Sequence, residues 1–87
     1  MTLDYLYNFI NRKPVILSKN NESYQIEEVR KNEKNLYVYG KRKSYPNLKY
    51  AFILDSIYDY FTNANGDIEA FFNGNKEFVF RRGLLAG

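Results

Sequence analysis

The side chains of this chain that could engage a ligand are concentrated in one basic, tyrosine-rich stretch. No Asp or Glu lies between Glu33 and Asp55, an interval that we call the acid-free window. The window contains five bases and four tyrosines, namely Lys34, Lys41, Arg42, Lys43, Lys49, Tyr37, Tyr39, Tyr45 and Tyr50. Ammonium and guanidinium groups displace the counterions of phosphates, and aromatic rings accept stacked bases. The window is therefore typical of a surface that binds a polyanion.

The acid-free window also carries the charge asymmetry of the chain. The 87 residues include 13 Lys and Arg and 10 Asp and Glu, which gives a net charge of +3. When the five bases of the window are subtracted from the 13, eight bases remain against ten acids. The window thus supplies more than the whole net charge, which favours a partner with a phosphate-bearing or acidic surface.

We predict a binding surface built from the window and from a second basic point near the C-terminus. Its candidate residues are Lys41, Arg42, Lys43, Lys49, Tyr37, Tyr39, Tyr45, Arg81 and Arg82. Tyr37 and Tyr39 share one face of an expected strand, so they are placed to stack bases while the basic loop contacts phosphates. The alternative is structural: either Tyr37 and Tyr39 or Leu36 and Val38 face the core, and the bases only keep a loop in water. Arg81 and Arg82 extend the surface only if the fold brings them beside the loop.

The residue types that most enzyme mechanisms need are missing. The chain has no His and no Cys, so the commonest general base, the thiol nucleophile and the usual soft metal ligands are absent. Asp55, Asp59, Asp67 and Glu69 offer a loose cluster for a hard metal ion. A helix cap, a turn and solvent-facing strand positions account for these carboxylates more simply. We therefore predict no catalytic residue, no metal site and no cofactor, and a protein that is not an enzyme.

The cysteine count and the N-terminal residues indicate a compartment. A chain without cysteine forms no disulfide, which favours a reducing environment. The N-terminus lacks the basic start and apolar run of a secretion signal. The longest apolar run, residues 50–54, is far shorter than the ~18 residues of a membrane span. We expect a cytoplasmic protein with no membrane partner.

The first half of the chain predicts a helix followed by a meander of strands. Thr2 is placed to cap a helix that Pro14 ends, with apolar residues at helical spacing: Leu3, Leu6, Tyr7 and Ile10. Alternating hydrophobic residues predict short strands at residues 15–17, 24–29 and 36–39. A turn is expected at residues 20–21 and a bulge at Glu27 and Glu28, where alternation breaks. Two further segments follow, a basic loop at residues 40–47 and a buried strand at residues 48–54.

Residues 55–74 allow two interpretations. In the first, Asp55 caps a helix that carries Ile57 and Phe61 on one face and ends at Gly66. In the second, this region forms strands joined by Asn-Gly turns, at residues 57–62, 68–72 and 76–81. We favour strands, because Tyr, Phe, Ile and Thr dominate residues 57–62 and are poorer helix formers than Ala or Leu.

Together these elements predict an α+β fold. An N-terminal helix packs on a small antiparallel β-sheet or partly closed barrel of five to seven short strands, broadly like SH3-like or Sm-like architectures. Sixteen of the hydrophobic residues are Tyr or Phe, which predicts an aromatic rather than an aliphatic core. Residues 1–83 form a single small domain, and residues 84–87 form a short tail.

Two functions fit this sequence. The first is a non-catalytic binding protein that engages nucleic acid or a nucleoprotein through a basic Tyr-rich hairpin. The second is an inhibitor or adaptor that sterically blocks a host protein machine, such as a CRISPR or restriction effector. In size, composition and lack of chemistry the chain resembles the small accessory proteins of phages and mobile elements, and its richness in Asn, Lys and Tyr resembles proteins from AT-rich genomes. A homodimer through Leu84 and Leu85 or an exposed edge strand is a further expectation.

Overall fold

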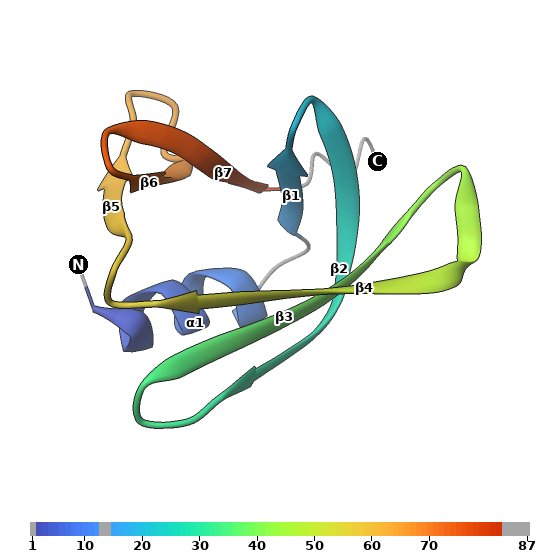
Figure 1. The fold of residues 1–87 in the computed structure, drawn as a ribbon, viewed down its shortest axis with the longest axis horizontal. Coiled ribbons are helices and arrows are strands. Elements are labelled where there is room, and N and C mark those ends of the chain that lie inside the picture. Colours follow the sequence, from blue (N-terminus) through green and yellow to red (C-terminus); the bar gives the residue numbers. More distant parts are fainter. Residues whose placement is uncertain (1, 13–14, 83–87) are drawn as a thin grey trace.

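A computed structural model describes residues 2–12 and 15–82, which form one helix and seven strands (Figure 1). In chain order these are α1 (Leu3–Arg12), β1 (Val15–Lys19), β2 (Glu22–Lys31), β3 (Asn35–Arg42), β4 (Tyr45–Asp55), β5 (Asp59–Thr62), β6 (Ile68–Phe72) and β7 (Asn75–Arg82). The expected tail, residues 84–87, lies outside the described residues.

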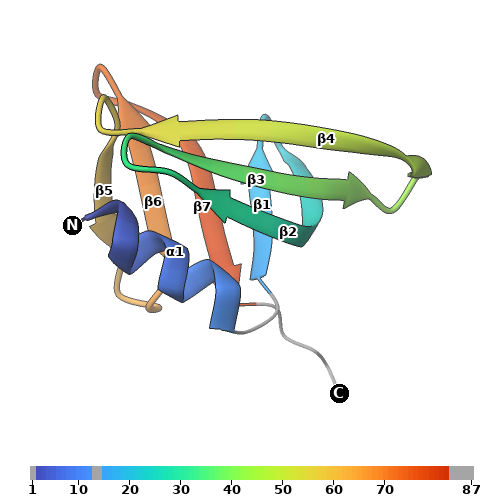
Figure 2. The same ribbon diagram turned by 90° about the horizontal axis from the view of Figure 1, so that it is seen from below.

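All seven strands belong to one antiparallel sheet, in the order β4-β3-β2-β1-β7-β6-β5. The sheet bends strongly, so that β2, β3 and β4 run across the direction of β1, β7, β6 and β5 (Figure 2). Although β4 and β5 follow each other in the chain, they are the two edges of the sheet. No ladder of hydrogen bonds joins them in the described part, so the sheet is not closed into a barrel.

Helix α1 forms where the sequence predicts it. The Tyr5 N–H donates a hydrogen bond of 3.2 Å to Thr2 Oγ1, which confirms Thr2 as the N-cap. The helix contacts β2 and β3, and its Leu6 and Ile10 are buried in the same core as the strand residues. At its first turn, Asp4 lies 2.7 Å from Lys31 Nζ of β2, a carboxylate placed where the helix dipole favours it.

Three tight turns carry the positive φ angles that the sequence signals require. Asn20 and Asn21 adopt φ of 53° and 63°, and Asn73 and Gly74 adopt 51° and 80°. Two consecutive left-handed residues are typical of type I′ hairpin turns. Gly66, at φ 83°, lies in the turn between β5 and β6. The strand interpretation of residues 55–74 is therefore confirmed.

The predicted bulge in β2 is also present. The register between β2 and β3 shifts between Ile26 and Glu28. Two neighbouring glutamates, Glu27 and Glu28, consequently reach bases on the same side of the sheet. The bulge lets Ile26 and Val29 both pack against the core.

Two predictions for residues 40–54 were wrong. Residues 40–47 are not a basic loop: β3 continues to Arg42 and β4 starts at Tyr45, which leaves a two-residue turn. Residues 48–54 are not a buried strand, because only Leu54 of β4 is buried and Leu48 and Ile53 are 51% and 56% exposed. The apolar run resembles a central strand, but its place at the sheet edge leaves most of it uncovered.

The core combines an aliphatic centre with an aromatic border, so the composition-based prediction of an aromatic core is correct only in part. Among the described residues, nine of the twelve buried hydrophobic residues are aliphatic, and the aromatic ones are Tyr24, Phe78 and Phe80. Six further aromatic residues are partly buried against them: Tyr7, Phe9, Tyr50, Phe52, Tyr58 and Tyr60. Strand alternation explains this outcome, because β3 turns Leu36 and Val38 inward and leaves its tyrosines on the opposite face. Tyr37 and Tyr39 are thereby left for the outer face.

Candidate binding surface

The outer face of β2, β3 and β4 gathers most of the predicted binding residues. Cross-strand partners share a face, and the register sets Tyr37 opposite Ile53 and Tyr39 opposite Ala51. We call this surface the tyrosine face; its residues are Glu27, Glu28, Arg30, Tyr37, Tyr39, Lys41, Lys49, Ala51 and Ile53. Both tyrosines are half-buried and turn away from the core, while Leu36 and Val38 face it.

Tyr37 is held in place at the turn between β2 and β3. Its hydroxyl accepts hydrogen bonds from the side-chain amides of Asn32, at 3.2 Å, and Asn35, at 3.3 Å. Asn32 Oδ1 in turn accepts the backbone N–H groups of Lys34 and Asn35, at 2.9 and 2.8 Å. The ring of Tyr37 therefore has a fixed position on the surface before any partner arrives.

Tyr39 lies between the charged side chains of its neighbouring strands. Lys49 Nζ is 5.7 Å from the Tyr39 ring centroid, within the range of a cation–π contact. On the other side, Glu28 is the cross-strand partner of Tyr39. Tyr39 is thus an aromatic surface flanked by one base and one acid.

Acids from β2 pair with the bases of the acid-free window. Lys41 Nζ lies 3.4 Å from Glu27 Oε2, and Lys49 Nζ lies 3.9 Å from Glu28 Oε1. Glu28 also binds Arg30 Nε at 2.5 Å, and this hydrogen bond raises the pKa of the guanidinium. The bases of the acid-free window therefore have acidic neighbours in the fold, because β2, which carries the glutamates, pairs with β3.

Arg42 and Tyr45 lie at the tip of the β3–β4 hairpin, away from the tyrosine face. Arg42 follows the outward Lys41 in β3 and so points to the other side of the sheet. Its Nη2 is 3.1 Å from Glu22 Oε1, and its guanidinium carbon is 4.9 Å from the centroid of the Tyr45 ring. Glu22 also accepts a hydrogen bond of 3.0 Å from the Tyr24 hydroxyl. Lys43, in the turn itself, is exposed and has no acidic partner among residues 2–12 and 15–82.

The structure does not bring Arg81 and Arg82 beside the hairpin. Cross-strand partners lead across the sheet from Arg81 to Ile16, then to Gln25 and then to Lys41. Arg81 and Lys41 are therefore three strand spacings apart, roughly 15 Å along the sheet. Arg82 lies with its guanidinium carbon 5.3 Å from the centroid of the Phe9 ring of α1. The bases of the hairpin, Lys41 to Lys43, and the two arginines of β7 therefore do not form one patch.

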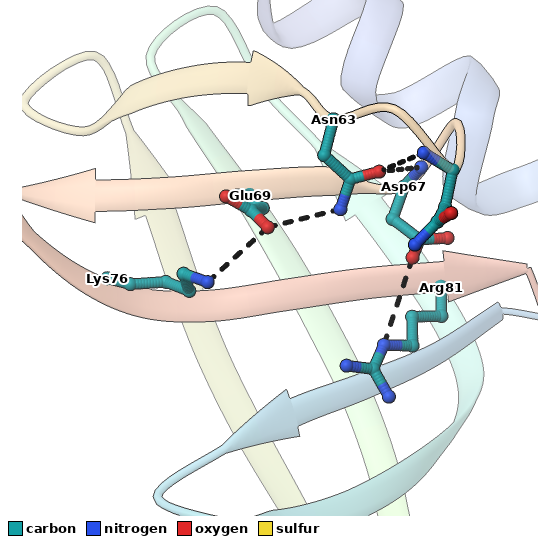
Figure 3. Close-up of polar contacts among 6 residues, drawn as sticks. Asn63, Asp67, Glu69, Lys76 and Arg81 are labelled. Carbon is teal, nitrogen blue, oxygen red and sulfur yellow. Dashed lines mark hydrogen bonds and ion pairs between the residues drawn. The ribbon is translucent and has the colours of Figure 1, made fainter.

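Arg81 belongs instead to a polar network around the β5–β6 turn (Figure 3). Asn63 Oδ1 accepts the N–H groups of Asn65 and Asp67, at 2.9 and 3.0 Å, and its amide donates to Glu69 at 3.1 Å. Lys76 Nζ lies 3.4 Å from Glu69, and Arg81 Nε lies 3.8 Å from Asp67. The Asn63 hydrogen bond, with help from Lys76, lowers the pKa of Glu69.

Three of the four carboxylates considered for a metal ion already have hydrogen-bond or ion-pair partners. Asp67 and Glu69 are engaged by bases and amides, and Asp55 Oδ1 accepts the Ile57 N–H at 3.0 Å after β4. In the part of the chain that the structure describes, no three His, Cys, Asp or Glu side chains are grouped to hold a metal ion. The same part contains no helix with the length and apolar character to cross a membrane.

Two open hollows lie outside the tyrosine face. One of about 430 Å³ lies over β1, β2 and β7, and its bases include Lys76 and Arg81, which Glu69 and Asp67 already engage. The other, of about 410 Å³, lies where the β2–β3 and β4–β5 turns meet Leu3 of α1.

Ala51 and Ile53 belong to the tyrosine face but were not predicted from the sequence. Their neighbours in β4 are apolar on both sides, so no alternation marks them as outward-facing. A weaker signal is present in the sequence. Lys49 and Asp55 lie on the same face of the strand as Ala51 and Ile53, and their charged side chains require solvent. No family model, curated protein or solved structure matches this chain, so its function is inferred from the geometry of this surface.

Proposed function

We propose that this chain is a non-catalytic protein-binding module that engages a partner protein through the tyrosine face. The observation that carries the proposal is the outward placement of Tyr37, Tyr39 and Ile53 on one rigid sheet, inside a border of paired charges. A non-catalytic protein of this kind acts by occupying a surface of its partner, as an adaptor or a steric inhibitor does.

The composition of the tyrosine face supports a protein partner. Protein interfaces combine an apolar, aromatic-rich centre with a polar rim, and Tyr and Arg are enriched among the residues that dominate binding. Here Ile53, which is 56% exposed, and the two tyrosine rings form the centre. Lys41 and Arg30, with their glutamates, form the rim.

The charge balance of this face also favours protein over nucleic acid. Three bases, Arg30, Lys41 and Lys49, stand against two acids, Glu27 and Glu28, which leaves one net positive charge. Affinity for nucleic acid depends on the number of phosphates that a protein neutralises. Bases that already have carboxylate partners neutralise fewer of them.

Nucleic acid or a nucleoprotein is the second candidate partner, and one observation favours it. Tyr37 and Tyr39 stand next to each other on an open sheet, as base-stacking residues do in several RNA-binding folds. Lys43, exposed at the hairpin tip, is placed to contact a phosphate there. This function predicts binding that falls steeply with salt.

Affinity capture from a lysate of the source cells distinguishes the two functions. The immobilised chain is expected to retain a specific protein after nuclease treatment, and Ile53→Glu is expected to reduce the retained amount at least about tenfold, because it buries a charge in the interface. Ile57→Glu is the matched control, since Ile57 is 61% exposed but lies in the turn after β4.

Three results would contradict the proposal. Loss of all captured protein on nuclease treatment would favour the nucleic-acid function instead. Equal capture by the Ile53→Glu and wild-type chains would show that the partner binds elsewhere. Failure to retain any specific protein from the nuclease-treated lysate would also count against a protein partner.

A further inference from the structure

The free edge of β4 is long and apolar. β4 spans Tyr45–Asp55 and lies at one end of the strand order, so β3 is its only strand partner among residues 2–12 and 15–82. At its last residue, the Asp55 C=O accepts a hydrogen bond of 2.8 Å from the Tyr60 hydroxyl. A strand with an unpaired edge presents N–H and C=O groups that pair readily with another strand. Figure 2 shows β4 along the border of the molecule, extending beyond β1 and β2.

The two halves of β4 differ in their fitness for pairing. The first half contains Pro46, which has no N–H to donate and protects an edge from pairing. The second half is a run of five apolar residues, Tyr50 to Leu54, with Lys49 before it and Asp55 after it. This half has no proline and no internal charge.

The charges that bracket this run make it complementary to itself. In an antiparallel pair of two identical strands, the residue numbers of any two opposing positions add up to the same constant. A constant of 104 sets Phe52 opposite Phe52 on the two-fold axis and Lys49 opposite Asp55 at both ends. It also sets Ala51 opposite Ile53, which is an apolar pair on the outer face, and it leaves Pro46 outside the paired segment.

Neighbouring registers lack this match. A constant of 102 sets Lys49 opposite Ile53 and Asp55 opposite Asn47, and a constant of 100 sets Lys49 opposite Ala51. Opposite charges directly across a strand pair stabilise it, and a charge facing an apolar side chain does not. The charge pattern therefore selects one register out of the three.

We infer that β4 pairs with β4 of a second copy of this chain, in the antiparallel register that sets Lys49 of each copy opposite Asp55 of the other. The seven-stranded sheets of the two copies join into one sheet across a two-fold axis at Phe52. The tyrosine faces of both copies then lie on the same side of that sheet. The inference rests on the edge of β4 alone and does not depend on the proposed function.

The first test uses purified chain and its molar mass in solution. Light scattering after size exclusion is expected to shift from 10.4 kDa toward twice that mass as the concentration rises to about 1 mM, a range that covers weak interfaces. A constant mass of 10.4 kDa over the whole series would overturn the inference.

Charge exchange tests the register. Lys49→Glu sets two acids opposite each other at both ends of the pair, and Asp55→Lys does the same with bases, so each variant alone is expected to raise the dissociation constant about tenfold. An equimolar mixture of the two variants restores opposite charges at both ends and is expected to dimerise. Asp55→Lys also removes the hydrogen bond to Ile57, and recovery in the mixture shows that this chain is still folded.

Lys43→Glu provides the control for this experiment, because it makes the same charge change outside the paired segment and is expected to leave dimerisation unchanged. Dimerisation of Lys49→Glu as strong as that of the wild type, or a mixture no better than the single variants, would overturn the register.

Cysteine cross-linking provides an independent readout, since the chain has no cysteine of its own. Directly opposed residues of an antiparallel pair lie about 4.5 to 5.5 Å apart at Cα, which a disulfide spans. A mixture of Ala51→Cys and Ile53→Cys chains is expected to form disulfide-linked dimers, and each variant alone is not. Cross-linking of the single variants to the same extent as the mixture would contradict the proposed pairing.

Discussion

At the scale of single residues, the glutamates of β2 decide the electrostatic character of the candidate surface. Glu22, Glu27 and Glu28 each lie within reach of a base of the acid-free window. Such partly exposed pairs contribute about 0 to 1 kcal/mol each to stability. Under the proposed function their larger effect is on the choice of partner, because they occupy bases that a polyanion would otherwise contact.

Glu69 gives a pH-dependent prediction at the same scale. Its pKa lies below the usual 4.5 because Asn63 and Lys76 stabilise the carboxylate. A depressed folded-state pKa contributes stability that is present above the unfolded-state pKa and is lost as the pH falls through the folded-state pKa. Glu69→Gln is therefore expected to be less stable than the wild type by about 1 kcal/mol at pH 7, with the difference shrinking below about pH 4.

Urea unfolding of both proteins at pH 7 and pH 3 measures this difference. The comparison between the two chains cancels the other carboxylates, which titrate in both. An equal stability difference at the two pH values would mean that the charge of Glu69 plays no part in the network.

At the scale of elements, α1 depends on a cap that the sequence already identifies. Thr2→Ala removes the acceptor for the Tyr5 N–H and is expected to cost about 1 kcal/mol, which corresponds to a fall in Tm of about 4 to 8 °C for a chain of this size. Thr2→Ser keeps the hydroxyl and is expected to unfold close to the wild-type temperature. A thermal melt in which Ser and Ala lower the Tm equally would argue against capping.

Local signals predicted the elements well. Thr2 and the apolar spacing of Leu6 and Ile10 located the helix, and the paired Asn residues and Asn-Gly located three turns. The bulge at Glu27 and Glu28 was visible as a break in alternation. Each of these features depends on residues within a few positions of one another, so a single sequence contains the information.

Features that depend on distant residues were not predicted. The apolar run Tyr50 to Leu54 resembles a buried strand, and only the strand order places it at an edge. The ion pairs of Lys41 and Lys49 with Glu27 and Glu28 depend on the register between β2, β3 and β4. The separation of Arg81 from the hairpin follows from the position of β1 and β2 between them. Sequence patterns specify strands, but they do not specify which strands become neighbours.

At the scale of the whole molecule, the sheet divides its aromatic residues between the core and the surface. Nine aromatic rings lie in the core or pack against it, and others lie over the outer face and edges, where Tyr45 and Phe61 are 52% and 57% exposed. Exposed aromatic groups are typical of interaction sites. The molecule therefore combines a small scaffold with several exposed aromatic side chains on its surface.

We propose that Glu27 and Glu28 of β2 pair with the bases of the tyrosine face and leave a surface suited to a protein partner. The direct measurement is the anisotropy of a labelled single-stranded oligonucleotide titrated with the wild type and with Glu27→Gln/Glu28→Gln, over a series of salt concentrations. We expect weak binding by the wild type and at least about tenfold tighter binding by the double variant, with a log–log salt slope steeper by about 2 for the three released bases, Arg30, Lys41 and Lys49.

Glu33→Gln/Glu77→Gln, which makes the same change in net charge elsewhere, separates pairing from overall charge and is expected to bind like the wild type. Tight, steeply salt-dependent binding by the wild-type chain, unchanged when Glu27 and Glu28 are replaced, would show that these acids do not mask the bases.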